Sequence, residues 1–288
     1  MNYAGKILTY LGEPDRFSQV LLIAGAPPVE KVGTQFRIVI NAVLTPEDIR
    51  DTLSTFASHA RRSGSSELGN QGVFAFGIPN QGRFKIHYLT QRGSVFVSIQ
   101  RMPFDIPKLE SLLAQPAQLA LVDGTLSLPN GGIVIFTGTS PETLNRFLYA
   151  TLARINEKRH MIVYVLEQHL SFLLKHQNSI VIQVEVGTDI PSLTEGIRNG
   201  LFLAPDLIYV SNPKTPEEFR GLMCAAQSGA IVFMSAIAIN EQHLLNDLRT
   251  QLPDDFALLR HYIRQIITVN TNPAGLISLV ESKLAPQQ

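Results

Sequence analysis

The middle of the chain reads GIVIFTG over residues 132–138 and TSPETLNR over residues 139–146. The first run is continuously apolar, which is typical of a strand buried on both faces of a parallel sheet. In the second run Ser140 precedes Pro141 and Glu142, and this order of hydroxyl, proline and acid predicts the start of a helix. A buried strand that leads directly into a helix is the repeating unit of an α/β fold.

The same helix-start pattern occurs at Thr45-Pro46-Glu47 and at Thr215-Pro216-Glu217. The three patterns predict helices over 45–62, 140–157 and 215–228. Apolar periodicity predicts further helices over 2–11, 107–114, 166–176, 191–200, 241–250, 254–268 and 274–284.

Strand patterns differ between the two halves of the chain. In the first half, the alternation of Phe84, Ile86 and Tyr88 with other residues indicates a half-buried antiparallel strand. In the second half the apolar runs are continuous and helical segments separate most of them, which indicates a parallel sheet. The predicted strands are 20–24, 36–41, 73–76, 83–89 and 95–99 in the first half, and 133–136, 161–165, 180–184, 207–210 and 231–233 in the second.

The segment that joins the halves contains Pro103, Pro107, Pro116 and Pro129, and this density of proline predicts a linker. The expected organisation is therefore an α+β domain over residues 1–103, a linker over 104–130, and an α/β domain that ends in helices over 131–288.

Composition excludes several classes of protein. Lys+Arg and Asp+Glu both number 24, so the basic excess of a nucleic-acid binder is absent. The single cysteine, Cys224, excludes an internal disulfide and a cysteine zinc site. The seven histidines lack metal-ligand spacing, so no metal site is expected. The sequence shows no signal peptide and no apolar stretch long enough to span a bilayer, which predicts a cytoplasmic location.

Several short motifs occur in one collinear order. They are SQVLLIAGAPP at 18–28, GRFKI at 82–86, the strand at 132–138, APDLIYV at 204–210 and AAQSG at 225–229. In this order and spacing, the chain resembles the type II/type IV secretion ATPase family, which includes the PilT-like pilus-retraction motors. The resemblance runs to about residue 250 and implies an N-terminal α+β (PAS-like) domain followed by a RecA-like, P-loop-type α/β domain.

The phosphate loop of that family, GPTGSGKST, falls on residues 138–146. Such a loop needs glycines that expose backbone N–H groups, a lysine for the β/γ-phosphates and a hydroxyl for Mg²⁺. Here Leu144 stands at the lysine position and Asn145 at the hydroxyl position, and Ser140 is expected to be an ordinary helix cap. The resemblance thus implies a vestigial loop made of Gly138, Thr139, Ser140, Pro141, Glu142, Thr143, Leu144 and Asn145.

The other family motifs are also altered. The chain keeps Glu167 in VLEQH but has no aspartate there, Asn212 replaces a family glutamate, and Ile237 replaces a family histidine. These three positions are expected to be vestigial rather than catalytic.

Three basic residues lie at or near family arginines that reach a neighbouring subunit's nucleotide, namely Arg83, Lys85 and Arg92. Two interpretations stay open for them. They are surface charges on an antiparallel strand, or they act in trans on an active paralogue.

The resemblance and its departures favour a pseudo-ATPase over an enzyme, as a structural or regulatory component of type IV pilus or type II secretion machinery. No cofactor is then expected, and the expected partners are copies of itself, a paralogous motor ATPase or platform proteins at the inner face of the cytoplasmic membrane. The alternative is a weak or atypical enzyme that binds ATP and Mg²⁺ through the remaining backbone and Glu167. A third hypothesis is that the pocket has been reused for another small molecule.

Overall fold

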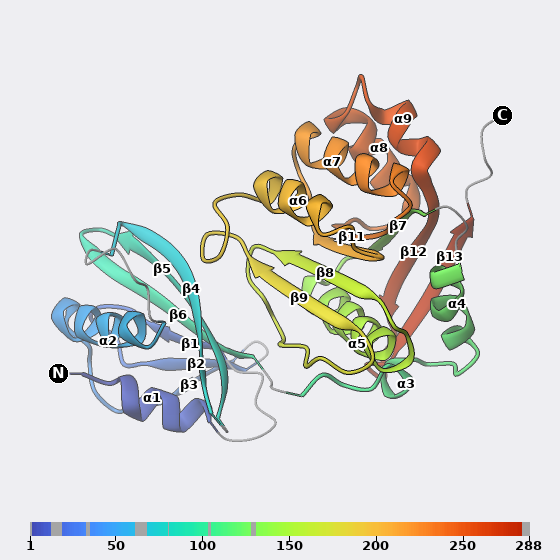
Figure 1. Ribbon diagram of the computed structural model, residues 1–288. Helices are drawn as coiled ribbons and strands as arrows, with labels where there is room; N and C mark the ends of the chain where they lie inside the picture. The colour runs from blue at the N-terminus through green and yellow to red at the C-terminus, as the bar shows by residue number, and fades with distance from the viewer. Residues whose placement is uncertain are drawn as a thin grey trace. The chain divides into compact units, whose positions relative to one another are not determined.

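The computed structural model describes residues 2–12, 19–32, 35–60, 68–79, 81–102, 105–127 and 131–283. The chain forms two compact units, Met1–Asp105 and Ile106–Gln288. In Figure 1 the first unit is coloured blue to cyan and the second green to red. None of the helices in the described ranges is both long enough and apolar enough to cross a bilayer.

Unit 1 is a six-stranded antiparallel sheet in the order β3-β2-β1-β6-β5-β4, with two helices on one face (Figure 1). Leu53 and Phe56 of α2 pack with Phe84 and Ile86 of β5 in one core, which confirms the predicted α+β class and the alternation of β5. The elements are α1 (Ala4–Leu11), β1 (Gln19–Leu22), β2 (Val29–Val32), β3 (Gln35–Ile38), α2 (Pro46–His59), β4 (Gln71–Ile78), β5 (Gly82–Gln91) and β6 (Ser94–Met102). Strand β2 is an addition to the prediction.

Unit 2 is built on a seven-stranded sheet in the order β13-β12-β7-β11-β10-β8-β9, in which all strands except β13 run parallel. Helices α3, α4 and α5 cover one face, and α6 to α9 cover the other, so the predicted doubly covered parallel sheet is confirmed (Figure 1). The elements are α3 (Leu109–Leu112), α4 (Gln118–Gly124), the 3-10 turn η1 (Thr125–Ser127), β7 (Gly132–Gly138), α5 (Pro141–Lys158), β8 (Ile162–Glu167), β9 (Ile180–Glu185), α6 (Leu193–Phe202), β10 (Leu207–Ser211), α7 (Pro216–Gln227), β11 (Ile231–Ile237), α8 (Glu241–Gln251), α9 (Phe256–Tyr262), β12 (Ile263–Thr271) and β13 (Ile277–Lys283).

The C-terminal part of the chain differs from the expected helices. The helix predicted over 254–268 stops at Tyr262, and the one predicted over 274–284 is absent, because β12 and β13 occupy this region. Ile263, Ile266 and Ile267 are buried in β12, where they extend the sheet beside β7. Branched side chains pack well on a pleated surface, so burial in the sheet outweighs the helical period.

The helix predicted over 166–176 is also wrong. Strand β8 continues to Glu167, and the segment after it is irregular. Side chains of β9 bind its backbone instead: Leu170 N donates to Glu185 Oε2 at 3.2 Å, and Leu174 N donates to Gln183 Oε1 at 2.7 Å. These bonds satisfy donors that a helix would have satisfied within itself.

The expected linker over 104–130 instead belongs to unit 2 from Ile106 to the end of its described part. Ala114 N donates to Ile277 O at 2.7 Å, and the Gln118 side chain donates to Leu279 O at 3.1 Å. Both carbonyls lie on β13, the edge strand, so this segment covers an edge that would otherwise be open to pairing. The described part of the segment is therefore a covering layer rather than a spacer.

Two glycines allow α6 to lie directly against β8. A Cβ at Gly196 would lie 2.5 Å from Leu166 Cδ1, and a Cβ at Gly200 would lie 2.7 Å from Tyr164 Cε1. The Tyr164 hydroxyl in turn donates to Gly196 O at 3.0 Å. The close approach therefore depends on the missing side chains of α6 and on a direct bond from the sheet.

We predict that Gly200→Ala lowers the free energy of unfolding by about 1–3 kcal/mol, because the added methyl overpacks a filled interface. Gly5→Ala is the matched control: a Cβ at Gly5 meets nothing within 4 Å, and Gly5 lies in α1. The control is expected to leave stability unchanged or to raise it by less than about 1 kcal/mol. Urea unfolding measures both, and equal stabilities for the two variants would contradict the prediction.

Candidate functional site

The carboxyl ends of the parallel strands meet at one edge of the unit 2 sheet, where open α/β sheets bind their ligands. Strand β7 ends there at Gly138, β8 at Glu167, β10 at Ser211 and β11 at Ile237. Gly138 pairs directly with Ile237, and Asn212 follows the end of β10. The structure therefore brings together the predicted positions 138–145, Glu167, Asn212 and Ile237 at this edge.

Only Thr139 and Ser140 separate β7 from α5. Ser140 is the N-cap, as predicted: its hydroxyl accepts a hydrogen bond from Thr143 N at 3.2 Å. Its carbonyl accepts from Leu144 N at 3.0 Å. Pro141 has no N–H, so the amide of Glu142 is the one left in this turn for any ligand.

The side chains of the first turn of α5 point to the core or to protein partners. Leu144 is 2% exposed and packs with the core between α5 and the sheet. The Asn145 amide donates to the Ser171 hydroxyl, and the Thr271 hydroxyl, at the end of β12, donates to the Thr143 hydroxyl at 3.3 Å. Position 144 thus contributes apolar packing where the resemblance expects a cation.

Glu167 is a buried carboxylate held by tyrosines. It is 3% exposed, and the Tyr149 hydroxyl of α5 donates to its Oε2 at 2.6 Å. Tyr209 of β10 also hydrogen-bonds it, and Ser211 and Ser235 bond to the Tyr209 hydroxyl in turn. Burial, followed by the negative charge of Glu167, raises the pKa of both tyrosines well above 10, so both remain protonated donors.

Asn212 and Ile237 are held by backbone bonds. Asn212 has φ 51°, a left-handed conformation that asparagine tolerates, and its N–H donates to Ser235 O at 3.0 Å. Ile237 is 43% exposed, and Ala238 N, after it, donates to Gly138 O at 3.2 Å. The two positions thus present an amide and an alkyl group at the edge, neither of which can act as a general acid or base.

The three basic residues lie in unit 1. Arg83 and Lys85 share one face of β5, opposite to the face that carries Phe84 and Ile86 into the core. Arg92 lies in the turn after β5, with φ 50°, roughly 30 Å along the strand from Arg83. The structure therefore groups Arg83 with Lys85 but separates Arg92 from them.

Sequence reasoning missed the two tyrosines that hold Glu167. One signal was available: Tyr209 places a hydroxyl inside the apolar run Leu207–Val210, and a buried hydroxyl needs a partner. Tyr149 lies within the apolar face of α5 in the same way. Among the described residues, no three His, Cys, Asp or Glu side chains form a group that could hold a metal ion.

No protein-family model matches the chain. Among curated proteins, it is 27% identical over 238 residues to the type IV pilus ATPase PilU of Pseudomonas aeruginosa. The matched region covers 83% of this chain and 61% of PilU. It is 24% identical over 216 residues to the type IV pilus retraction ATPase PilT of the same organism. The matched region covers 75% of this chain and 61% of PilT. The chain thus spans about three fifths of the length of these relatives.

Solved structures show the same fold. The pilus retraction motor PilT with bound ADP superposes with a TM-score of 0.80 at 23% identity, covering 99% of this chain and 83% of that one. The ATPase DotB of Legionella pneumophila superposes with a TM-score of 0.74 at 17% identity, and the superposition covers 95% of this chain and 78% of DotB. The chain is therefore similar in sequence to type IV pilus ATPases and has the fold of PilT, which confirms the RecA-like class.

The raised pKa values of Tyr149 and Tyr209 predict a loss of stability in alkali. Above pH about 10 the unfolded chain releases these protons and the folded chain keeps them, so the free energy of unfolding falls as pH rises, by up to about 1.4 kcal/mol per pH unit for each tyrosine. Tyr149→Phe is expected to lower stability at neutral pH by about 1–3 kcal/mol and to make the alkaline slope shallower.

Chemical unfolding between pH 8 and 11 measures both effects. Ile155→Val, a change at another buried position of α5 that removes no titrating group, is the control for general destabilisation. An alkaline slope that is the same in Tyr149→Phe as in the unaltered chain would show that the network does not hold its protons as described.

Proposed function

We propose that the chain is a non-catalytic member of the type IV pilus and secretion motor ATPases, and that it acts as a structural or regulatory component of such machinery. The likeness to PilU and PilT supports the family. One observation carries the non-catalytic part: α5 begins at Pro141, inside the span that a phosphate loop would occupy.

The groups at this helix start do not fit a Mg²⁺-nucleotide. Of the backbone donors in the first turn of α5, the amide of Glu142 remains, and the same residue carries a carboxylate. Repulsion between that carboxylate and a phosphate a few Å away costs on the order of a few kcal/mol at intermediate dielectric. With Leu144 in the core, no cation from the lysine position offsets the cost.

Glu167 is the one residue that favours the alternative, a weak or atypical ATPase, because the family glutamate is retained. A general base must be within reach of a water molecule or substrate proton. Here Tyr149 and Tyr209 bind the carboxylate and the side chain is buried. This arrangement supports a structural role for Glu167.

The first prediction from this proposal is that calorimetric titration with Mg-ATP gives no binding at micromolar concentrations and that no ATP hydrolysis is detected. P. aeruginosa PilT in the same buffer is the positive control. Micromolar binding by the unaltered chain, or hydrolysis that Glu167→Gln abolishes, would overturn the non-catalytic assignment and establish the alternative.

The second prediction concerns partners. We expect the chain to assemble with itself, with a paralogous motor ATPase or with pilus or secretion platform proteins, and to reach the inner face of the cytoplasmic membrane through them. Affinity capture from the native cell, followed by mass spectrometry, is expected to recover such components, and capture should be equal with and without added ATP. Recovery of no motor, pilus or secretion component would count against the role in this machinery.

A further inference from the structure

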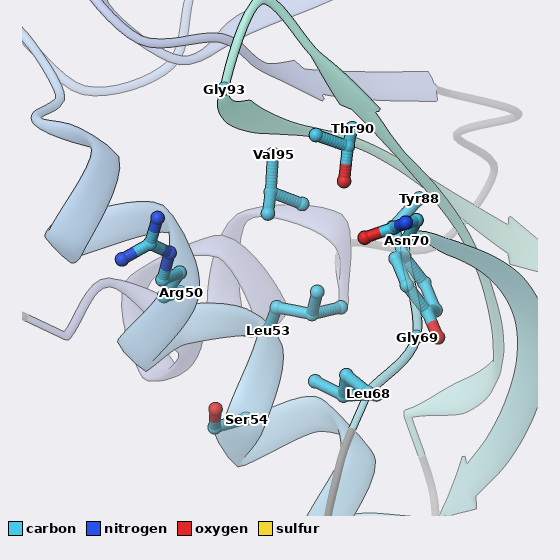
Figure 2. A pocket seen from close by; sticks show the side chains of 10 residues that line it. All are labelled: Arg50, Leu53, Ser54, Leu68, Gly69, Asn70, Tyr88, Thr90, Gly93 and Val95. Atoms are coloured by element: carbon cyan, nitrogen blue, oxygen red, sulfur yellow. The ribbon is translucent and has the colours of Figure 1, made fainter.

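Unit 1 contains a cavity of about 520 Å³ between α2 and the β5–β6 hairpin, far along the chain from the edge of the unit 2 sheet. We propose that this cavity binds a small organic carboxylate with an apolar body. The lining residues are Arg50, Leu53, Ser54, Leu68, Gly69, Asn70, Tyr88, Thr90, Gly93 and Val95 (Figure 2). The volume lies within the range of small-molecule sites, about 300–1,000 Å³.

The floor of the cavity is apolar and rigid. Leu53 of α2 is 2% exposed and Tyr88 of β5 is 3% exposed, and both belong to the core of unit 1. Figure 2 shows Leu53, Val95 and Leu68 around a common space. Because the floor is part of the core, the cavity is preformed rather than created by a moving surface side chain.

Two glycines set the backbone around the cavity. Gly93 has φ 77° in the turn between β5 and β6, and a Cβ there would meet nothing within 4 Å. Gly72 pairs with Tyr88 across the strands, and a Cβ at Gly72 would lie 2.6 Å from the Tyr88 hydroxyl. Glycine at 72 thus lets the phenol ring of Tyr88, which lines the cavity, pack directly against β4.

The described part of the rim is polar, and its one charged side chain is a cation. Among the described residues, Arg50 is the one ionic residue that lines the cavity, no carboxylate lines it, and Arg50 forms no ion pair. Ser54 lies one helical turn after Arg50 on α2, so both side chains share a helix face. A guanidinium without a protein partner recognises a carboxylate or phosphate through parallel N–H bonds.

Neutral hydrogen-bonding groups complete the site on the side of the sheet. Thr90 N donates to Asn70 O at 2.7 Å, which holds the two segments together. In Figure 2 the Thr90 hydroxyl and the Asn70 amide face the space above Leu53. One cation, several neutral polar groups and an apolar floor match an organic anion whose apolar part is buried, and inorganic phosphate would leave that floor unfilled.

Calorimetry with 4-phenylbutyrate and its neutral amide, 4-phenylbutanamide, tests the proposal on the full chain. We expect submillimolar binding of the carboxylate and about tenfold weaker binding of the amide. Arg50→Gln is expected to weaken carboxylate binding about fivefold to tenfold and to leave amide binding unchanged, since it removes one partly exposed charge contact. Arg37→Gln, on exposed strand β3, is the matched control and should bind as the unaltered chain does.

A second variant tests the location of the site. Ser54 is exposed on α2, so Ser54→Trp should fold, as circular dichroism can verify, and its indole should fill the cavity and abolish binding of both probes. The proposal is overturned if 4-phenylbutyrate does not bind at millimolar concentration. It is also overturned if binding survives both Arg50→Gln and Ser54→Trp, or if inorganic phosphate binds as tightly. Because the site lies in unit 1, these outcomes are independent of the behaviour of the chain toward Mg-ATP.

Discussion

The short junction from β7 into α5 determines the arrangement of unit 2. The helix starts two residues after the strand because Ser140 caps it and Pro141 sets its first dihedral angle. A Cβ at Gly138 would lie 2.6 Å from Val269 O, so the end of β7 also has to be glycine for β12 to lie beside it. From that start, α5 directs Leu144 into the core and Tyr149 to Glu167, and Arg154 to Asp123 of α4.

The buried carboxylate of Glu167 is stabilised by groups of the chain itself. An unpaired ionised glutamate in an apolar environment would be strongly destabilising, and two phenol donors with a serine pair behind them lower that cost. Asn145 bonds Ser171, and β9 side chains bind the segment after β8. These polar side chains are thus bonded to other groups of the chain itself.

Residue patterns predicted most of the elements that are stabilised by their own local sequence. They predicted the wrong element where contacts with distant parts of the chain determine the secondary structure. The capped helices α2, α5 and α7 and the parallel strands β7 to β11 have local signals of caps and apolar runs, and these were sufficient. Residues 254–284 carry an apolar pattern that is compatible with a helix. The strands β12 and β13 are more stable there because β12 pairs with the free edge of β7. Likewise, nothing local in 166–176 shows that Gln183 and Glu185 will bind its backbone.

The meeting of positions 138–145, Glu167, Asn212 and Ile237 at one edge was predictable because family motifs and sheet geometry agree on the carboxyl edge. The hydrogen-bond network around Glu167 was not predictable, since Tyr149 and Tyr209 come from elements far apart in sequence.

Each residue at the start of α5 that we propose to disfavour phosphate also favours the folded chain. A serine cap contributes about 1 kcal/mol, and an acidic residue in the first turn contributes about 0.3–1 kcal/mol through the helix dipole. Proline at the first helical position reduces the entropy of the unfolded chain, and a buried leucine contributes about 1.5–3 kcal/mol. A phosphate loop lacks these contributions, since it exposes bare amides and a cation until its ligand arrives. For the non-catalytic role proposed above, the stability of the fold alone is therefore sufficient to favour Ser140-Pro141-Glu142 with Leu144 in the core.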